Sequence, residues 1–420
     1  MLQTKNKKYK TLLPVYLKGL TSGKYTLRQA SESTAYTITH LWRLKNRYKT
    51  EGLLGLENRR IYTSPVNRIP QELRNKIVAL YATDEYSGLN FKYYCESLED
   101  YENIKINYQT LRRIMKEAGV RSPRAHHTKT KSKVHQPRPR RECEGDLWQI
   151  DGTPFEWFKK FGNFKKYCIH AGVDDATSKL TAMYMTENEC VYGYNEILRI
   201  TAMRHGLPRE CYSDRAAMFC VTPKEKKNLS KWEELAGLHE KRTQWQRILE
   251  DLNIRQVLAW SPQAKGRVER MWEVVQDRLP LFLYKNGCDT VEKANKILPK
   301  FVEYYNKKFG VTAKDDDDFY IDAPKNLDHI LTVQIPRQTY LNGEFSFYGY
   351  KWIVKNCKRI SHRKFTLTIS ERGIYAYLDG LYYPVQLLEN LQEVSGENMA
   401  QVLKNIIYRY MYAPAKELSA

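Results

Sequence analysis

The stretch Lys166–Thr186, KYCIHAGVDDATSKLTAMYMT, decides the fold class of the central part of this chain. In its first half, apolar side chains recur at every second position (Tyr167, Ile169, Ala171 and Val173), which predicts a β-strand. The VDDATSK that follows is rich in turn-forming residues, and LTAMYMT (Leu180–Thr186) predicts a second strand. We therefore expect a β-hairpin that belongs to a larger sheet.

Strands and helices alternate outward from this hairpin. LWQID (Leu147–Asp151) predicts an earlier strand. Beyond the hairpin the patterns predict helix 192–204, strand ECYSD ending at Asp214, helix 244–252, strand IRQVLAW, a helix from Ser261 to about Tyr284, and helix 291–308. Three strands followed by this alternation predict a mixed sheet with helices on its faces. We assign the sheet to residues 146–310, with the polar segment 222–242 as an insertion.

Two helical modules are expected before this core, in residues 10–60 and 68–120. The first has expected helices over 13–20, after an N-cap at Thr26, and from about Thr37 to Thr50; the second has them over 71–83, 90–98 and 107–118. Paired short helices with a basic second helix suit the DNA major groove. We expect helix-turn-helix DNA-binding modules, and an ordinary small helical domain is the alternative for the first.

The positive charge of the chain lies mainly in its first third. The protein has 69 Lys and Arg residues against 48 Asp and Glu, a net charge of +21, and residues 1–145 hold 29 of the basic against 13 of the acidic ones. The densest run, within the expected linker 121–145, is RSPRAHHTKTKSKVHQPRPRR. Such a run gains affinity for DNA by releasing counterions; a solvated spacer is the alternative.

The last part of the chain predicts a small β structure. Residues 325–390 contain several short strand patterns, and Asn342–Gly343 and Asp379–Gly380 carry the chemistry of hairpin turns. We expect a β-barrel of SH3-like size, separated from the core near KDDDDF, with a tail or helix in residues 391–420. The run Lys351–Lys364 has six Lys and Arg residues and no acid, so DNA contact is expected there too.

Membrane, secreted and zinc-binding classes are disfavoured. The longest apolar runs are a handful of residues, whereas a membrane span needs about 20. The N-terminal MLQTKNKKYK is basic but lacks the apolar region of a signal peptide. None of the eight cysteines has the close spacing of a zinc site, so we expect reduced thiols in a cytosolic protein.

Three carboxylates fall where a metal site can be built. Asp151 and Asp214 end expected strands, and Glu269 lies two turns into the helix that starts at Ser261. Hard oxygen ligands suit Mg²⁺ or Mn²⁺. Two such ions about 4 Å apart support phosphodiester displacement without a covalent nucleophile. Spacing alone is weak support, because the chain has 48 acidic residues.

The sequence around these acids resembles a known family. The blocks are WQIDGTPFEWF (148–158), VDDATSK (173–179), YSDRAAMF (212–219), TQWQRILEDLNI (243–254) and SPQAKGRVERMWEVVQDRL (261–279). Together they are similar to DDE transposases with a retroviral-integrase-type core, above all the ISNCY group of bacterial insertion-sequence transposases. Phe155 departs from the pattern, which leads us to expect a histidine there, and so does the composition of 222–242.

The resemblance implies an RNase H-like core with Asp151, Asp214 and Glu269 as the catalytic, metal-binding triad, served by two Mg²⁺ ions for which Mn²⁺ may substitute. It implies a multidomain α/β enzyme that binds the inverted-repeat ends of an insertion sequence, hydrolyses phosphodiesters to free 3′-OH ends, and joins them to target DNA. The expected partners are double-stranded DNA and further copies of the chain, as a homodimer or higher oligomer. The expected location is the bacterial cytoplasm, associated with the nucleoid.

Several further residues have expected roles. The candidate DNA contacts are Gln263, Lys265, Arg267, Arg43, Arg47, Arg112, Arg113, Lys358 and Arg359. A salt bridge is the alternative for Arg267. Asp174 and Asp175 are interpreted as hairpin-turn residues, and Trp148 and His170 as core residues. Two other functions stay open: a domesticated, non-catalytic DNA-binding repressor of the same family, and a structure-specific nuclease with a further core carboxylate.

Overall fold

The computed structural model describes residues 13–34, 36–56, 68–123, 139–221, 227–235, 238, 240–259, 266–388 and 399–413. The chain divides into two compact units, Met1–Ile77 and Val78–Ala420.

The first unit is helical. It contains a helix over residues 13–21, α2 (Leu27–Ser33), α3 (Ile38–Glu51) and the 3-10 helix η1 (Gly52–Leu56). Thr26 and Thr37 cap α2 and α3 by accepting from backbone N–H groups, as their side-chain chemistry predicts. Leu17 and Leu41 are fully buried between the helices. The expected helices are confirmed, and their helix-turn-helix interpretation stays a prediction.

The second helical module lies mostly in the second unit. It consists of α4 (Gln71–Tyr81), which straddles the division between the units, α5 (Phe91–Glu102) and α6 (Tyr108–Glu117). Asn90 and Asn107 cap α5 and α6. Apolar residues at helical spacing, such as Leu111, Ile114 and Met115 of α6, form the buried side.

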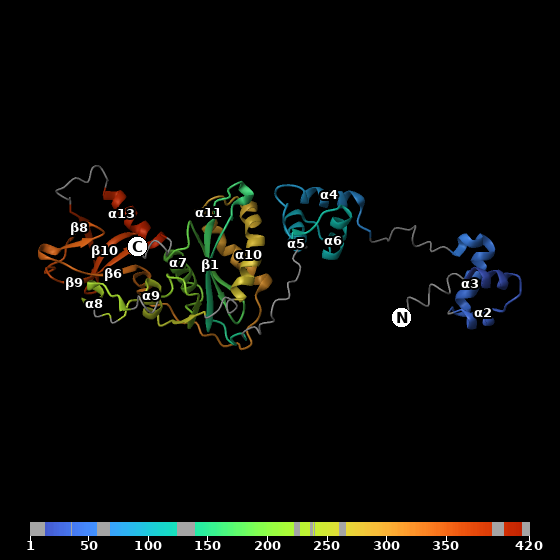
Figure 1. Ribbon diagram of the computed structural model, residues 1–420, viewed down its shortest axis with the longest axis horizontal. Coiled ribbons are helices and arrows are strands. Elements are labelled where there is room, and N and C mark those ends of the chain that lie inside the picture. The colour runs from blue at the N-terminus through green and yellow to red at the C-terminus, as the bar shows by residue number, and fades with distance from the viewer. Residues whose placement is uncertain are drawn as a thin grey trace. The chain divides into compact units, whose positions relative to one another are not determined.

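The centre of the second unit is the predicted mixed sheet, labelled at β1 in Figure 1, with the strand order β3-β2-β1-β4-β5. Its strands are β1 (Leu147–Phe155), β2 (Tyr167–Asp174), β3 (Leu180–Thr186), β4 (Glu210–Ser213) and β5 (Arg255–Leu258). The first three are antiparallel to one another, and β4 and β5 continue the sheet parallel to β1. The hairpin from which the fold class was predicted is confirmed as β2 and β3.

Helices cover both faces of this sheet. On one face α7 (Val191–Ala202) and α9 (Gln244–Asp251) pack with Trp148 and Ile150 of β1. On the other, α10 (Gly266–Lys285) and α11 (Val291–Phe309) pack with alternate residues of β2, including Ile169 and Ala171. The expected burial of Trp148 is therefore confirmed. The short α8 (Lys231–Leu235) is the described helix within the predicted insertion.

Two segments expected to be linkers contact the core. Residues 139–145, at the end of the predicted basic linker, are hydrogen-bonded to it, with Gly145 N–H donating to Asp174 at 2.9 Å. The acidic stretch KDDDDF, expected to mark a boundary, also stays on the core, since Phe319 N–H donates to the carbonyl of Glu144. Ile321 then pairs with Leu207. The core surface therefore extends past residue 310, up to α12 (Leu327–Ile330).

The C-terminal part is a six-stranded antiparallel sheet, nearly barrel-like, in the order β6-β9-β10-β11-β8-β7. Its strands are β6 (Val333–Gln338), β7 (Glu344–Phe347), β8 (Tyr350–Val354), β9 (Lys364–Ser370), β10 (Gly373–Leu378) and β11 (Leu381–Leu387). They surround a core that includes Trp352 and Leu367. A helix, α13 (Met399–Ile407), and a π-helical turn (Tyr408–Tyr412) pack against this core.

One of the two expected hairpin turns is confirmed and one is wrong. Asp379–Gly380 joins β10 to β11, and both residues have positive φ. Asn342–Gly343 instead lies in a 3-10 turn after β6, and β6 pairs with β9 rather than with β7. Asn-Gly supplies the positive φ values of a turn, but a local turn preference does not decide which strands pair, and Val333 and Ile335 of β6 lie opposite Ile369 and Leu367 of β9. A hairpin that we did not predict, at Tyr348–Gly349, joins β7 to β8.

No helix in the described residues is both long enough and apolar enough to cross a lipid bilayer.

Candidate active site

Two of the predicted acids lie on neighbouring strands. β1 pairs with β4 in parallel, with Leu147 opposite Glu210 and Gln149 opposite Tyr212. The same register, continued beyond the last paired residues, brings Asp151 level with Asp214. Both side chains are half-buried, and Asp214 caps its own turn by accepting from the N–H of Ala216 at 2.9 Å. The end of β4 therefore presents one carboxylate beside the other.

The third acid is carried by a helix that is hydrogen-bonded to Asp151. Glu269 is exposed in the first turn of α10. One turn later, the indole Nε1 of Trp272 donates to Oδ2 of Asp151 at 3.0 Å. Residues three apart on a helix lie on one side of it. The hydrogen bond thus ties the Glu269 side of α10 to the Asp151 carboxylate.

A buried polar network fixes the start of α10 to the sheet. The amide of Gln149 donates to Asp175 at 2.8 Å, while its oxygen accepts from the N–H of Val268 at 3.4 Å. The guanidinium of Arg267 pairs with the fully buried Asp175 at 2.7 Å. Arg267 therefore makes the salt bridge that was its alternative role, and its contact with DNA stays a prediction. Asp174 accepts from the N–H and hydroxyl of Thr177, as a turn residue does.

Asp151 and Asp214 lie at the same level of adjacent strands and Glu269 lies on the helix bonded to Asp151, but the three acids do not form a closed ligand set. Among the described residues, no three His, Cys, Asp or Glu side chains lie close enough together to hold one metal ion. The donor chemistry of Asp151, Asp214 and Glu269 nevertheless suits a hard divalent cation, because all three supply carboxylate oxygens. Gln263 and Lys265, the expected DNA contacts before α10, lie outside the described residues.

A further carboxylate that sequence reasoning missed lies on the other side of β1. Tyr194 donates its hydroxyl to Glu189 at 2.6 Å. A side chain at Gly152 would meet this pair, with its Cβ 2.9 Å from the Tyr194 hydroxyl oxygen and 3.1 Å from Oε1 of Glu189. Successive strand residues face opposite sides, so Glu189 covers the face that Asp151 does not use. In the sequence, the only sign of this close packing was the glycine that follows Asp151, Gly152.

His170 is a core residue, as predicted. It pairs with Gly152 across β1 and β2 and is fully buried. Its Nε2 accepts from the backbone N–H of Cys190 at 3.1 Å, and its Nδ1 lies 3.3 Å from the carbonyl of Tyr184. Burial lowers the pKa of this histidine to about 4. The imidazole is therefore neutral at physiological pH.

The other candidate DNA contacts are surface residues on separate elements. Arg43 and Arg47 are on α3, Arg112 and Arg113 on α6, and Lys358 and Arg359 follow β8. All are exposed except Arg47, which is half-buried. Arg113 also lies 4.0 Å from Glu117 in an exposed pair on its own helix. Their contact with DNA stays a prediction.

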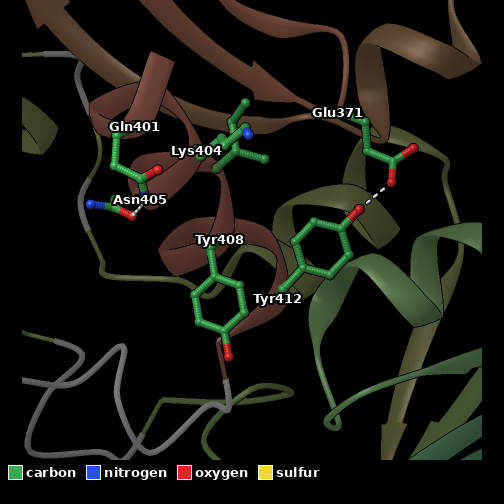
Figure 2. Close-up of a pocket in the computed structure, with 7 residues that line it drawn as sticks. Glu371, Gln401, Lys404, Asn405, Tyr408 and Tyr412 are labelled. Carbon is green, nitrogen blue, oxygen red and sulfur yellow. Dashed lines mark hydrogen bonds between the residues drawn. The ribbon is translucent and has the colours of Figure 1, made fainter. Parts of the chain in front are cut away.

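A hollow of about 500 Å³ lies away from these residues, against α13 (Figure 2). It is lined by Glu371, Gln401, Lys404, Asn405, Ile407, Tyr408 and Tyr412. Figure 2 shows Tyr412 donating to Glu371 and Gln401 bonded to Asn405. The predicted site residues lie elsewhere, and the one carboxylate in this lining is already bonded to a tyrosine. The hollow is therefore not a second candidate for the chemistry of the three acids.

Comparison with known proteins supplies two sequence relatives. The chain is 32% identical over 328 residues to the putative transposase y4bF of Sinorhizobium fredii, covering 77% of this chain and 68% of the relative. It is 27% identical over 328 residues to the transposase for insertion sequence IS1202 of Streptococcus pneumoniae, covering 71% and 68%. No family model matches the chain.

Solved structures with similarity to the chain include viral integrases. The HTLV-2 integrase catalytic core domain in complex with magnesium matches with a TM-score of 0.28 and 18% identity, over 40% of this chain and 88% of that one. The BIV integrase core domain has a TM-score of 0.26 and 20% identity, over 40% and 88%. The simian T-cell lymphotropic virus intasome gives 0.30 and 14%, over 70% and 99%. The family assignment rests on the two sequence relatives.

Proposed function

The chain belongs to the transposase family, and from that premise we propose that it cuts and joins DNA at the ends of its own insertion sequence. The observation that supports this most is the β1–β4 register, which brings Asp151 level with Asp214. The hydrogen bond from Trp272 to Asp151 holds the helix that carries Glu269 against the strand that carries Asp151. Acids far apart in the sequence are thus neighbours in the fold.

The proposed chemistry is two successive phosphoryl transfers. Water attacks the phosphodiester at the element end, which frees a 3′-OH on the element and leaves a 5′-phosphate on the flanking strand. That hydroxyl then attacks a phosphodiester of target DNA, forms a new phosphodiester with the target 5′ side and displaces a 3′-OH of the target strand. Asp151, Asp214 and Glu269 would hold divalent metal, Mg²⁺ or Mn²⁺, as two ions. Bound there, the metal would activate the attacking oxygen and stabilise the leaving one. The chain itself supplies the carboxylates, their positioning through Trp272, and a rigid start of α10 through the Arg267–Asp175 pair.

Recognition of element ends is proposed for the two helical modules. Arg43, Arg47, Arg112 and Arg113 would contact phosphates or bases there, and Gln263, Lys265 and Arg267 are further proposed DNA contacts. Lys358 and Arg359 would add a contact from the C-terminal sheet. Bringing two ends together requires at least a dimer. The proposed partners are therefore double-stranded DNA and further copies of this chain.

The two rival functions make different demands on the molecule. A structure-specific nuclease would use a further carboxylate beside the three acids, but Glu189 lies on the opposite side of β1 from the side chain of Asp151. A domesticated repressor needs no arrangement of acids at all. The register and the Trp272 bond have no evident use in a protein that only binds DNA, so we favour the enzyme.

The direct experiment is cleavage of end-labelled duplexes that carry the element termini, taken from the DNA flanking the gene. With Mg²⁺ or Mn²⁺ we expect nicks that leave 3′-OH ends, followed by joining of these ends to a second duplex; chelation should stop both. Specific binding to the same duplexes without any metal-dependent nick would contradict the enzyme and support the repressor.

We expect Trp272→Phe to slow cleavage about 10- to 100-fold, the usual cost of losing a residue that orients a metal ligand. Phenylalanine keeps the apolar contact but cannot donate to Asp151. DNA affinity should stay unchanged, and the metal concentration needed for half-maximal cleavage should rise. Trp352→Phe is the matched control, because its indole donates to the Phe347 carbonyl within the C-terminal sheet. Equal losses in both variants would contradict a specific role for Trp272.

A further inference from the structure

The second helical module is attached to the helix that carries Glu269. Arg278, on α10, is 4% exposed and pairs with Glu96 of α5 at 2.9 Å. Its guanidinium carbon lies 5.0 Å from the ring centroid of Tyr93 and 4.8 Å from that of Phe309. Glu96 also pairs with Lys308 of α11 at 2.9 Å. A charged group is therefore enclosed between the module and two helices of the core.

Further bonds hold α5 along its length. At its start, the side-chain amide of Asn90 donates to Asp277 at 2.8 Å, and the hydroxyl of Tyr93 donates to the Arg278 carbonyl at 3.1 Å. At its end, Glu102 lies 3.7 Å from Lys285, which also pairs with Glu85. We call the group Asn90, Tyr93, Glu96, Asp277, Arg278 and Lys308 the α5 contact.

The α5 contact limits how the module can move relative to the core. Hydrogen bonds and ion pairs depend on direction, and a buried charge without its partner is costly, so an arrangement that keeps all of them is strongly favoured. The α5 contact holds the start and the middle of α5, and the pair between Glu102 and Lys285 holds its end, so rotation as well as sliding is opposed. An apolar contact of the same size would permit both more readily.

The module turns a basic surface outward while α5 is attached. Arg112, Arg113 and Lys116 of α6 are exposed, and the buried side of α6 packs on α5. α10 extends from Glu269 in its first turn to Arg278 in the α5 contact. One continuous helix thus connects a candidate catalytic acid with the element that supports the basic surface. DNA held by α6 is at a fixed place relative to Glu269.

We propose that the α5 contact selects the phosphodiester that is cut, by acting as a rigid spacer within one chain between the DNA-reading surface of α6 and the acids. Contacts to DNA phosphates fix the register of a protein on the duplex. A rigid connection transfers that register to the acids, and a loosened connection lets neighbouring phosphodiesters reach them. This inference rests on the proposed function and adds to it the element that determines the position of the cut.

The test uses the full chain and end-labelled element-terminus duplexes, with cut positions read at single-nucleotide resolution. The variants are Glu96→Gln, which weakens the pair with Arg278, and Glu96→Gln combined with Tyr93→Phe. Glu99→Gln is the matched control, since Glu99 is on the same helix but pairs with exposed Lys105 at 3.5 Å. Circular dichroism verifies that each variant is folded.

We expect the wild type and Glu99→Gln to cut at one position. The Glu96 variants should distribute cuts over neighbouring positions, with the share at the wild-type position falling about threefold or more while total cutting stays within about twofold. Hydroxyl-radical footprints without metal should show the same loss of register as blurred boundaries of the protected DNA. A purely stabilising contact would lower the rate and leave the position unchanged.

Two outcomes separate this inference from the proposed function. Variants that cut at the wild-type position with sharp footprints overturn the spacer, whatever their rate. A wild type that never cuts overturns the enzymatic proposal. In that case blurred footprints in the Glu96 variants, with a sharp footprint for Glu99→Gln, would still support a spacer within a DNA-binding protein.

Discussion

Replacement of Asp151 by Asn, Asp214 by Asn or Glu269 by Gln is expected to reduce cleavage and joining of element ends by roughly 1000-fold or more each. Each change keeps the shape of the side chain and removes the negative charge that binds a divalent cation. In Asp151→Asn the amide oxygen of the new side chain can still accept from Trp272, so α10 should remain in place. The loss should therefore appear in the reaction and not in the fold.

The measurements that check this are a cleavage assay and an electrophoretic mobility assay on the same duplexes. Affinity for element ends should change less than about threefold, because the proposed recognition surfaces are on other elements. Glu273→Gln is the matched control for Glu269→Gln, because Glu273 is an exposed acid one turn further along α10. If all three triad variants cut as fast as the wild type, the site assignment is wrong.

The local structure of the chain was largely predictable, because its signals are local. Alternation of apolar residues identified β2, the expected N-cap Thr26 identified the start of α2, and the helix expected from about Thr37 is found as α3. Strand pairing was less predictable. The Asn342–Gly343 pair has the chemistry of a hairpin, yet β6 joins β9, because a local turn preference does not decide which strands pair.

The site could be predicted in composition but not in geometry. The acids were found through the sequence blocks around them, whereas their proximity depends on the β1–β4 register, which brings together residues far apart in the chain. The hydrogen bond from Trp272 to Asp151 and the pair between Arg267 and Asp175 are equally non-local. No sequence pattern marks which of many arginines meets a buried aspartate. Such contacts are decided by packing.

His170 is expected to make the stability of the fold depend on pH, and it pairs with Gly152 on the strand that carries Asp151. Its ring packs directly on the backbone of α7, since a Cβ on Gly193 would approach its Nδ1 to 2.3 Å. The ring also lies edge-on to Tyr194 at 4.6 Å. Burial is the main cause that lowers its pKa to about 4, and the hydrogen bond to the Tyr184 carbonyl opposes this in part. Protonation in the folded state is therefore strongly disfavoured.

We expect this histidine to remove about 3 kcal/mol of unfolding free energy as the pH falls from about 6.5 to about 4. The pKa of His170 in the folded chain lies below its value of about 6.5 in the unfolded chain. Below about pH 6.5 the histidine therefore binds a proton in the unfolded state but stays neutral in the folded state. The stability that the neutral ring contributes is fully present above the pKa of the unfolded chain. It is lost as the pH falls from there to the pKa of the folded chain. Burial raises the pKa of Asp174, which acts in the opposite direction. The contribution of His170 must therefore be isolated by comparison with a variant.

His170→Gln supplies that comparison, because glutamine can accept from the Cys190 N–H but does not titrate. Urea unfolding of the wild type and the variant at about pH 7 and about pH 4.5 gives two differences in unfolding free energy. The advantage of the wild type at the higher pH should shrink by about 2–3 kcal/mol at the lower one. His362→Gln, a change of the same type at an exposed residue, is the matched control. An equal pH dependence for wild type and His170→Gln would mean that the ring binds its proton equally well in the folded and the unfolded chain. The packing around Gly152 and Asp151 would then have to tolerate a buried charge.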